Sequence, residues 1–183
     1  MRIAYADPPY PGQSKKHYED HPDYAGEVDH GELITRLMDE YPDGWALSTN
    51  PGCLRDLLPL CPEKHRVLAW VKPFAAWKRN HWPAYAWEPV ILVGGRSCYS
   101  TRQTPRDFIA EPITMRRGLS GAKPLAFCLW LFDCLGCTPD DELVDLFPGS
   151  GAVADAWETF CAQMPLAFPA EPETEPMFTE EAA

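Results

Sequence analysis

Near its start the chain reads Arg2-Ile3-Ala4-Tyr5-Ala6-Asp7-Pro8-Pro9-Tyr10, a short apolar run that stops at two prolines. The apolar run, residues 2–6, predicts a buried strand. The two prolines end this strand, because proline lacks the backbone N–H that the interior of a sheet requires. The sequence thus predicts a carboxylate, that of Asp7, immediately after the end of a buried strand.

Further along the chain, strand and helix patterns alternate up to about residue 161. We expect strands at residues 45–49, 67–71, 88–95 and 142–147, and helices at residues 30–41, 53–60, 123–136 and 151–161. This alternation predicts an α/β fold with a mostly parallel sheet and helices on both faces. Ligands of such sheets bind at the carboxyl ends of the strands.

The length of 183 residues suits one domain. We expect this domain over residues 1–168, followed by an acidic, Pro- and Glu-rich tail at residues 169–183 that is disordered. Residues 11–29 are expected to form a long loop.

The cysteines and the apolar segments indicate a cytoplasmic protein. Seven cysteines without framework spacing suit reduced thiols, and we find no export signal and no apolar run that could span a membrane. Cys134 and Cys137 form a single C-x-x-C pair. A zinc site needs a second pair or suitably spaced histidines, so we expect no metal.

The charge of the chain is divided unevenly. The whole chain carries −11, yet residues 64–123 hold eleven basic and three acidic side chains, a net charge of +8. One positive region on an otherwise acidic body favours a nucleic-acid partner. The alternative, that loops simply collect arginines, stays open.

Asp7-Pro8-Pro9-Tyr10 has the chemistry to hold an exocyclic amine. The prolines make the backbone rigid and leave carbonyl groups next to the Asp7 carboxylate, so several acceptors can face the two hydrogens of one amine. Tyr10 offers an aromatic face on which a base can stack. An Asp-capped turn with a packed tyrosine is the alternative interpretation.

A second motif, Phe147-Pro148-Gly149-Ser150-Gly151, joins an expected strand to an expected helix. Its glycines allow a tight turn and a close approach of a ligand to the backbone. The start of the following helix can receive a carboxylate. Tight packing of the strand on the helix would explain the same glycines.

Taken together and in this order, the two motifs resemble those of S-adenosylmethionine-dependent methyltransferases that act on the N6 amine of adenine. The catalytic motif comes first and the cofactor motif lies near the carboxyl terminus, as in permuted, beta-class DNA adenine methyltransferases and in mRNA adenosine methyltransferases. Ser120-Gly121-Ala122-Lys123-Pro124 resembles the Lys-Pro element of this family, and Trp70-Val71-Lys72 resembles one of its strand ends. The resemblance covers about residues 2–161.

The resemblance implies a Rossmann-like methyltransferase fold and S-adenosylmethionine as the methyl donor. The family's strand after the cofactor helix has only a weak counterpart at residues 165–168, so a sheet trimmed at that edge stays open. It implies that Asp7 and Pro8 bind the N6 amine, that Pro9 shapes the motif and that Tyr10 stacks on the flipped adenine. The expected cofactor-binding residues are Asp7, Lys123, Asp145, Phe147, Gly149, Ser150 and Gly151. The methyl group would pass directly to the amine nitrogen.

The family order places target recognition between the catalytic motif and the Lys-Pro element, which here is the basic segment, at about residues 73–122. The expected nucleic-acid-binding residues are Lys15, Lys16, Lys72, Lys78, Arg79, Arg102, Arg106, Arg116 and Arg117. The segment is short, so recognition could extend over few bases or require a homodimer.

Two alternatives stay open within this interpretation. RNA could replace DNA as the substrate, because phosphate contacts are common to both polymers. The protein could also bind nucleic acid without catalysing transfer. The family's acidic ribose-binding residue has only Glu171 as a candidate, beyond a weak strand pattern at residues 165–168. Cytosine methylation is disfavoured, since the relatives that use cytosine usually carry serine in place of Asp7.

Overall fold

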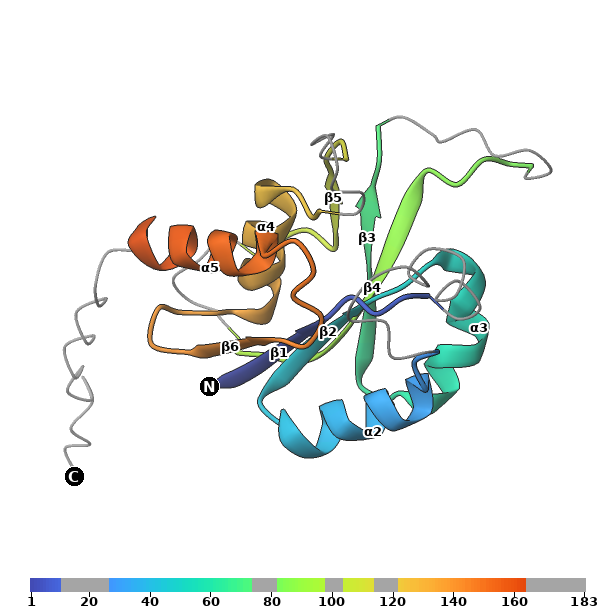
Figure 1. Ribbon diagram of the computed structural model, residues 1–183, viewed down its shortest axis with the longest axis horizontal. Coiled ribbons are helices and arrows are strands. Elements are labelled where there is room, and N and C mark those ends of the chain that lie inside the picture. Colours follow the sequence, from blue (N-terminus) through green and yellow to red (C-terminus); the bar gives the residue numbers. More distant parts are fainter. Residues whose placement is uncertain (11–26, 74–81, 98–103, 114–121, 164–183) are drawn as a thin grey trace, which may run out of the picture.

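A computed structural model describes residues 1–10, 27–73, 82–97, 104–113 and 122–163 of the protein. Within them, one six-stranded sheet lies between helices, with the strands in the order β5-β3-β4-β2-β1-β6 (Figure 1). The strands are β1 Arg2–Ala6, β2 Gly44–Ser48, β3 His65–Val71, β4 Trp87–Gly94, β5 Phe108–Ala110 and β6 Glu142–Asp145. The helices are α2 His30–Glu40, α3 Leu54–Leu57, α4 Leu125–Leu135 and α5 Ala152–Gln163, with short 3-10 turns at Pro51–Cys53 and Leu58–Leu60.

All strands of the sheet except β4 run in the same direction. β1 pairs in parallel with β2 and β6, and β3 pairs in parallel with β5. β4 is antiparallel to both β2 and β3. The expectation of a mostly parallel sheet is therefore confirmed, and the single reversed strand brings the start of β4 to the carboxyl ends of its neighbours.

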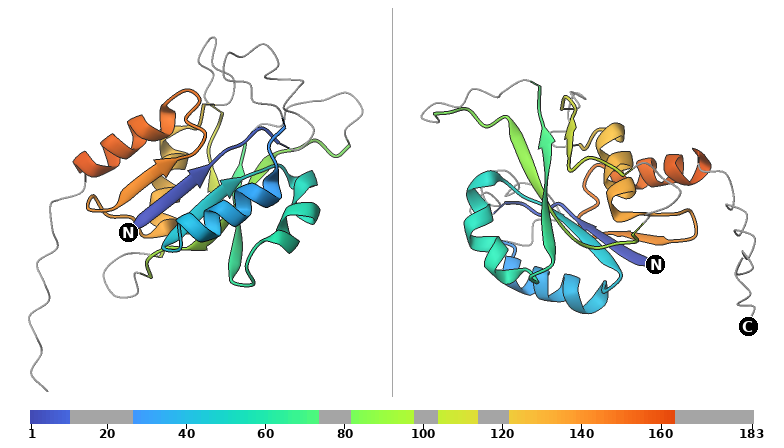
Figure 2. Two further views of the ribbon diagram at one scale, coloured as in Figure 1. Left: turned by 60° about the horizontal axis from the view of Figure 1, so that its bottom comes forward. Right: turned by 180° about the vertical axis from the view of Figure 1, so that it is seen from behind.

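Helices cover both faces of this sheet, as expected (Figure 2). On one face, α4 and α5 pack through Phe127, Phe132 and Phe160 against strand residues that include Tyr5 and Trp70. On the other face, residues of α2 and α3 pack against alternate positions of the same strands. The alternation of side chains along each strand thus builds two separate cores.

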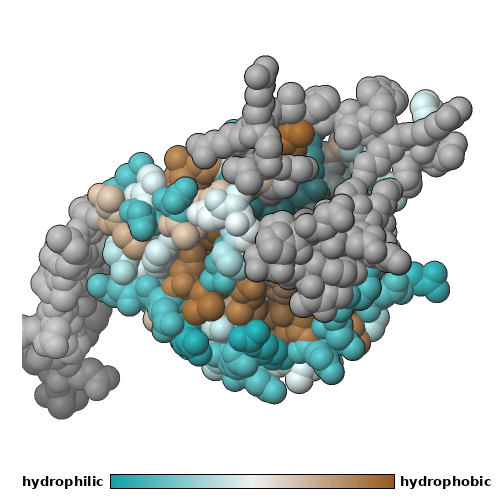
Figure 3. Space-filling view, viewed as in Figure 1, coloured by the Kyte–Doolittle hydropathy of each residue, from teal (hydrophilic) through white to brown (hydrophobic). Residues whose placement is uncertain are grey.

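α2 begins at the residue where the sequence predicts a helix. Asp29 caps it, and its carboxylate accepts hydrogen bonds from the backbone N–H groups of Gly31 (2.8 Å) and Glu32 (3.0 Å). Leu33, Ile34 and Leu37 are buried, while the outward side of the helix is hydrophilic (Figure 3). The 3.6-residue period of the sequence accounts for this helix.

Two expectations differ from the structure. Residues 53–60 form the four-residue α3 between two 3-10 turns in place of one continuous helix. Pro59 accounts for part of this interruption, because a helix interior requires a backbone N–H that proline lacks. β5, inside a stretch without periodicity, was not expected; it is three residues long and pairs only at the edge of the sheet.

Several expectations fall outside the described residues: most of the loop at residues 11–29, the weak strand at residues 165–168, Glu171 and the acidic tail. In the described part of the chain, no helix has the length and apolar character needed to cross a membrane.

Candidate functional site

The carboxyl ends of β1, β3 and β6 bring together residues that are far apart in the sequence. Asp7 directly follows β1, Lys72 directly follows β3, and Asp145 is the last residue of β6. Lys123 lies two residues before α4. Because parallel strands end at the same edge of a sheet, this edge gathers the two motifs that the sequence singled out.

Lys123 is the centre of a buried ion-pair cluster. Its ammonium nitrogen lies 2.9 Å from Oδ2 of Asp7 and 3.6 Å from Oε2 of Glu88, and its side chain is only 6% exposed. The ammonium also lies over the rings of Trp70, at 5.3 Å, and Phe127, at 5.8 Å. The structure thus places Lys123 against the catalytic candidate Asp7, whereas the sequence assigned it to the cofactor.

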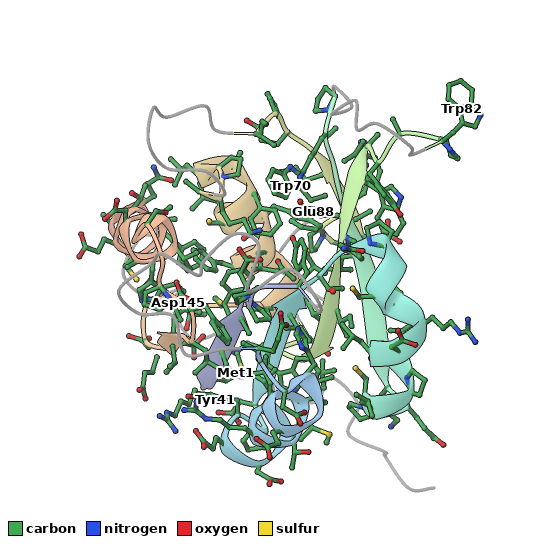
Figure 4. The ribbon with its side chains drawn as sticks, turned by 45° about the vertical axis from the view of Figure 1, so that its right-hand side comes forward. Met1, Tyr41, Trp70, Trp82, Glu88 and Asp145 are labelled. Atoms are coloured by element: carbon green, nitrogen blue, oxygen red, sulfur yellow. The ribbon has the colours of Figure 1, made fainter. Side chains whose placement is uncertain are left out.

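Glu88 connects this cluster to β3. Its second carboxylate oxygen, Oε1, forms a salt bridge with Lys72, whose ammonium lies 4.7 Å from the centre of the Trp70 ring. Trp70 is fixed in turn, because its indole N–H donates to the carbonyl of Glu111 at 2.8 Å. Figure 4 shows Trp70 and Glu88 side by side where β3 and β4 meet.

The carboxylates determine the protonation state of Lys123. Burial alone would lower the pKa of this lysine, but the negative charges of Asp7 and Glu88 outweigh burial, and its pKa is raised above the usual value. Lys123 is therefore expected to carry its positive charge at neutral pH, between the carboxylates of Asp7 and Glu88.

Asp145 brings the second motif close to Asp7. Tyr5 of β1 pairs with Asp145 of β6, and the N–H of Leu146 donates to the carbonyl of Tyr5 at 2.9 Å. Burial raises the pKa of Asp145; the N–H of Phe147 opposes this rise, and the nearby charge of Asp7 adds to it. The two motifs are close enough to affect each other electrostatically.

One oxygen of Asp145 is without a donor among the described residues. Oδ1 accepts the N–H of Phe147 at 3.1 Å, whereas Oδ2 is buried and unpaired. A buried acceptor without a partner is unfavourable by about 1–3 kcal/mol. Oδ2 is therefore suited to a donor supplied by a ligand.

The loop between β6 and α5 is a tight, glycine-dependent turn. The N–H of Gly151 donates to the carbonyl of Pro148 at 2.7 Å, and Ser150 Oγ accepts the N–H of Ala152 at 3.4 Å, near the start of α5. Gly149 and Gly151 have φ values of +46° and +77°, which favour glycine. A Cβ on Gly151 would meet no heavy atom within 4 Å, so the space beside this turn is open.

The structure locates the remaining predicted site residues as follows. Pro8 is buried, and Pro9 and Tyr10 are partly exposed, all directly after Asp7. Arg106 lies before β5, with its guanidinium 5.9 Å from the ring centre of Phe108 and its carbonyl accepting the indole N–H of Trp130. Outside the described residues lie Lys15, Lys16, Lys78, Arg79, Arg102, Arg116 and Arg117.

The sequence interpretation did not single out Glu88 as a site residue, and it named Trp70 only within the strand end Trp70-Val71-Lys72. Glu88 entered it only as one of three acidic residues in the basic segment. A carboxylate inside an otherwise apolar strand was the available signal, because such a group needs a positive partner when it is buried. Among the described residues, no group of three or more histidines, cysteines, aspartates or glutamates is placed to hold a metal ion.

Solved structures share this fold. The chain resembles the crystal structure of the M1.HpyAVI-SAM complex with a TM-score of 0.57 and 16% sequence identity, covering 87% of this chain and 78% of that one. A second crystal structure, of M1.HpyAVI, matches with a TM-score of 0.54, again at 16% identity, over 86% and 76% of the two chains. No protein-family model matches the sequence, and no curated protein matches it.

Proposed function

We propose that this protein transfers a methyl group from S-adenosylmethionine to the N6 amine of adenine in DNA. The observation that carries this proposal is the proximity of two sites at one sheet edge. Asp7-Pro8-Pro9-Tyr10 supplies hydrogen-bond acceptors for an amine. The second site combines Asp145, which has an unpaired acceptor oxygen, with open space beside the turn at Pro148–Gly151. The shared fold with M1.HpyAVI, solved as a SAM complex, supports the cofactor.

The residues of the second site fit S-adenosylmethionine. The unpaired Oδ2 of Asp145 suits the ammonium group of its methionine part, and the open turn at Gly149 and Gly151 admits a ligand close to the backbone. When bound, this cofactor supplies a methyl group on a positively charged sulfur. The ammonium of Lys123 binds the carboxylate of Asp7 in the structure, so we assign Lys123 to the amine site formed by Asp7 rather than to the cofactor.

The residues of the first site would hold and orient the amine. Asp7, whose Oδ2 is the oxygen in closest contact with Lys123, would accept one N–H of the amine through Oδ1, while the carbonyl of Pro8 would accept the other. Tyr10 would stack on the base. Catalysis then depends on orientation and on negative charge near the amine as it becomes positive.

The experiment that tests this proposal is methyl transfer from labelled S-adenosylmethionine to duplex DNA, single-stranded DNA and RNA. We expect transfer to adenine in DNA, with a base in a duplex first extruded from the stack. Transfer to RNA alone would favour the RNA alternative. No transfer to any polymer, with cofactor binding confirmed by calorimetry, would favour a non-catalytic binding protein.

Asp7→Asn and Asp7→Ala test the catalytic assignment. We expect each variant to reduce kcat by at least about 100-fold, because the amine loses its charged acceptor. Asp56→Asn, an exposed carboxylate on α3, is the matched control and should retain full activity. Circular dichroism checks that both Asp7 variants remain folded; full activity in either would show that the assignment is wrong.

A further inference from the structure

Lys72, Glu88, Lys123 and Asp7 form one line of alternating charges. Oε1 of Glu88 pairs with Lys72 and Oε2 faces Lys123, while Lys123 reaches Oδ2 of Asp7. Two ammonium groups balance two carboxylates. The closest cation contacts involve both oxygens of Glu88 and, on Asp7, Oδ2.

Lys123 cannot move freely within this line. Glu88 attracts it from one side and Asp7 from the other, and the rings of Trp70 and Phe127 lie within 6 Å of its ammonium. A buried ammonium that lost one of its two anions would be drawn more fully to the other, because a buried charge is stable only when it is paired. Without Glu88, Lys123 would therefore engage both oxygens of Asp7.

We propose that Glu88, anchored by Lys72, is a positioning residue that holds Lys123 on one oxygen of Asp7 and keeps the other oxygen for the substrate amine. This inference rests on the proposed function, since it gives the amine site of Asp7 its geometry. It identifies a role for Lys72, directly after β3, and for Glu88 on β4, which neither of the two sequence motifs contains.

The same contacts change the role of Lys72. The sequence placed it among the nucleic-acid-binding residues, but its ammonium is paired with Glu88 and lies over Trp70, and its side chain is only 21% exposed. A lysine held in this way has little freedom to reach a phosphate. Lys72 is therefore the anchor of Glu88 rather than a contact to the polymer.

The first test compares Glu88→Gln, Lys72→Met and the double variant. We expect each single variant to lower kcat by at least about tenfold with little change in KM, and the double variant to lose about as much as one single variant, because the two residues act as a unit. Glu88→Asp keeps the charge and should recover most of the activity. Glu142→Gln on β6 is the control. It removes an exposed carboxylate that pairs with Arg2 of β1, and it should behave as the unchanged protein.

Two binding measurements, which do not require methyl transfer, accompany this first test. Affinity for S-adenosylmethionine, measured by calorimetry, should stay within about twofold in all variants, since the change lies on the side of Asp7. The salt dependence of DNA binding, measured by fluorescence anisotropy, should be unchanged in Lys72→Met. Loss of one phosphate contact would instead lower the slope by roughly one unit.

The outcomes separate this inference from the proposed function. If the unchanged protein transfers methyl groups and Glu88→Gln keeps its kcat, the positioning role is wrong while the function stands. A lower salt slope of DNA binding in Lys72→Met would also overturn the inference, since it would make Lys72 a contact to the nucleic acid. So would a double variant whose loss in kcat equals the combined losses of the two single variants. If Glu88→Gln fails to fold, Lys72→Met decides, because an unchanged kcat in that variant would equally overturn the positioning role. Absence of transfer in the unchanged protein, with cofactor bound, would overturn both.

Discussion

At the scale of the residue, Asp145 is a buried carboxyl group whose two oxygens have different surroundings. One accepts the N–H of Phe147, and the other has no donor in the described part of the chain. Its pKa is raised by burial and by the charge of Asp7. This combination is unfavourable for folding and favourable for binding a cation, and such combinations are concentrated at functional sites.

Asp145→Asn should therefore weaken cofactor binding without weakening the fold. We expect the Kd for S-adenosylmethionine to rise by about tenfold or more, the effect of losing a hydrogen bond to a charged group. In the unchanged protein, affinity should increase as the pH rises through the raised pKa of Asp145, because only the ionised form attracts the ammonium; the variant should lack this dependence. Calorimetric titrations at several pH values measure both effects.

Stability of the same variant provides the control. A carboxyl group with a raised pKa in the folded state binds protons more tightly there than in the unfolded chain, so its contribution to stability falls as the pH rises. Asp145→Asn should consequently be at least as stable as the unchanged protein at neutral pH. A variant that binds the cofactor normally, or that unfolds, would contradict the assignment.

At the scale of the element, α4 ends where its last residues meet the loop after β4. Gly136 caps the helix with φ +65°, its N–H bonds to the carbonyl of Asp133, and the N–H of Arg96 donates to the carbonyl of Leu135 at 2.9 Å. A Cβ on Gly136 would overlap the carbonyl oxygen of Arg96. The glycine is needed both for its conformation and for this close approach.

Gly136→Ala should lower the free energy of unfolding by about 2 kcal/mol, because both the left-handed conformation and the overlap are unfavourable. Gly136→Asn should also be destabilising, since asparagine tolerates the conformation but not the overlap. Gly149→Asn is the comparison: its Cβ would meet only the carbonyl of Phe147 at 3.7 Å. Urea denaturation measures the free energy of unfolding of all three variants. Equal stability of Gly136→Asn and the unchanged protein would show that the close contact between Gly136 and the carbonyl of Arg96 does not contribute to stability.

At the scale of the whole molecule, Asp141 joins parts of the chain that are distant in sequence. Arg96, from the loop after β4, donates to both of its carboxylate oxygens, at 2.9 Å and 3.0 Å, and the N–H of Thr138 donates at 2.8 Å. The ammonium of Met1 lies 2.5 Å away. Burial alone would raise the pKa of Asp141, but these partners outweigh burial and hold it well below its usual range.

The protein should therefore lose stability in acid through Asp141. Because the pKa is lower in the folded state than in the unfolded chain, the stabilisation is complete above pH about 4 and is lost as the pH falls. Asp141→Asn should lower the free energy of unfolding at neutral pH by about 3 kcal/mol, since it removes the buried negative charge that pairs with Arg96 and with the Met1 ammonium. Denaturation at pH 7 and pH 3 measures this; the difference between the two proteins should shrink at the lower pH. A constant difference would exclude the ion pair as its cause.

The sequence by itself determined the fold class and the positions of the two motifs. The apolar run ending at Pro8 and Pro9 gives β1, the period of Leu33, Ile34 and Leu37 gives α2, and Gly136 gives the end of α4. These features depend on local physics: proline lacks an N–H, a helix repeats every 3.6 residues, and glycine adopts positive φ. Placement of Asp7 after a strand followed from the same signals, whereas the strand expected at residues 142–147 ends at Asp145 in the structure.

Only the tertiary structure decided which charges meet. The reversal of β4 carries Glu88 to the carboxyl end of the sheet, where it binds Lys72 and faces Lys123. Charge counted along the chain contains no such information, because ion pairs form between residues 16 and 116 positions apart. Strand order and direction fix these distances, and they arise from packing the whole sheet rather than from any one segment.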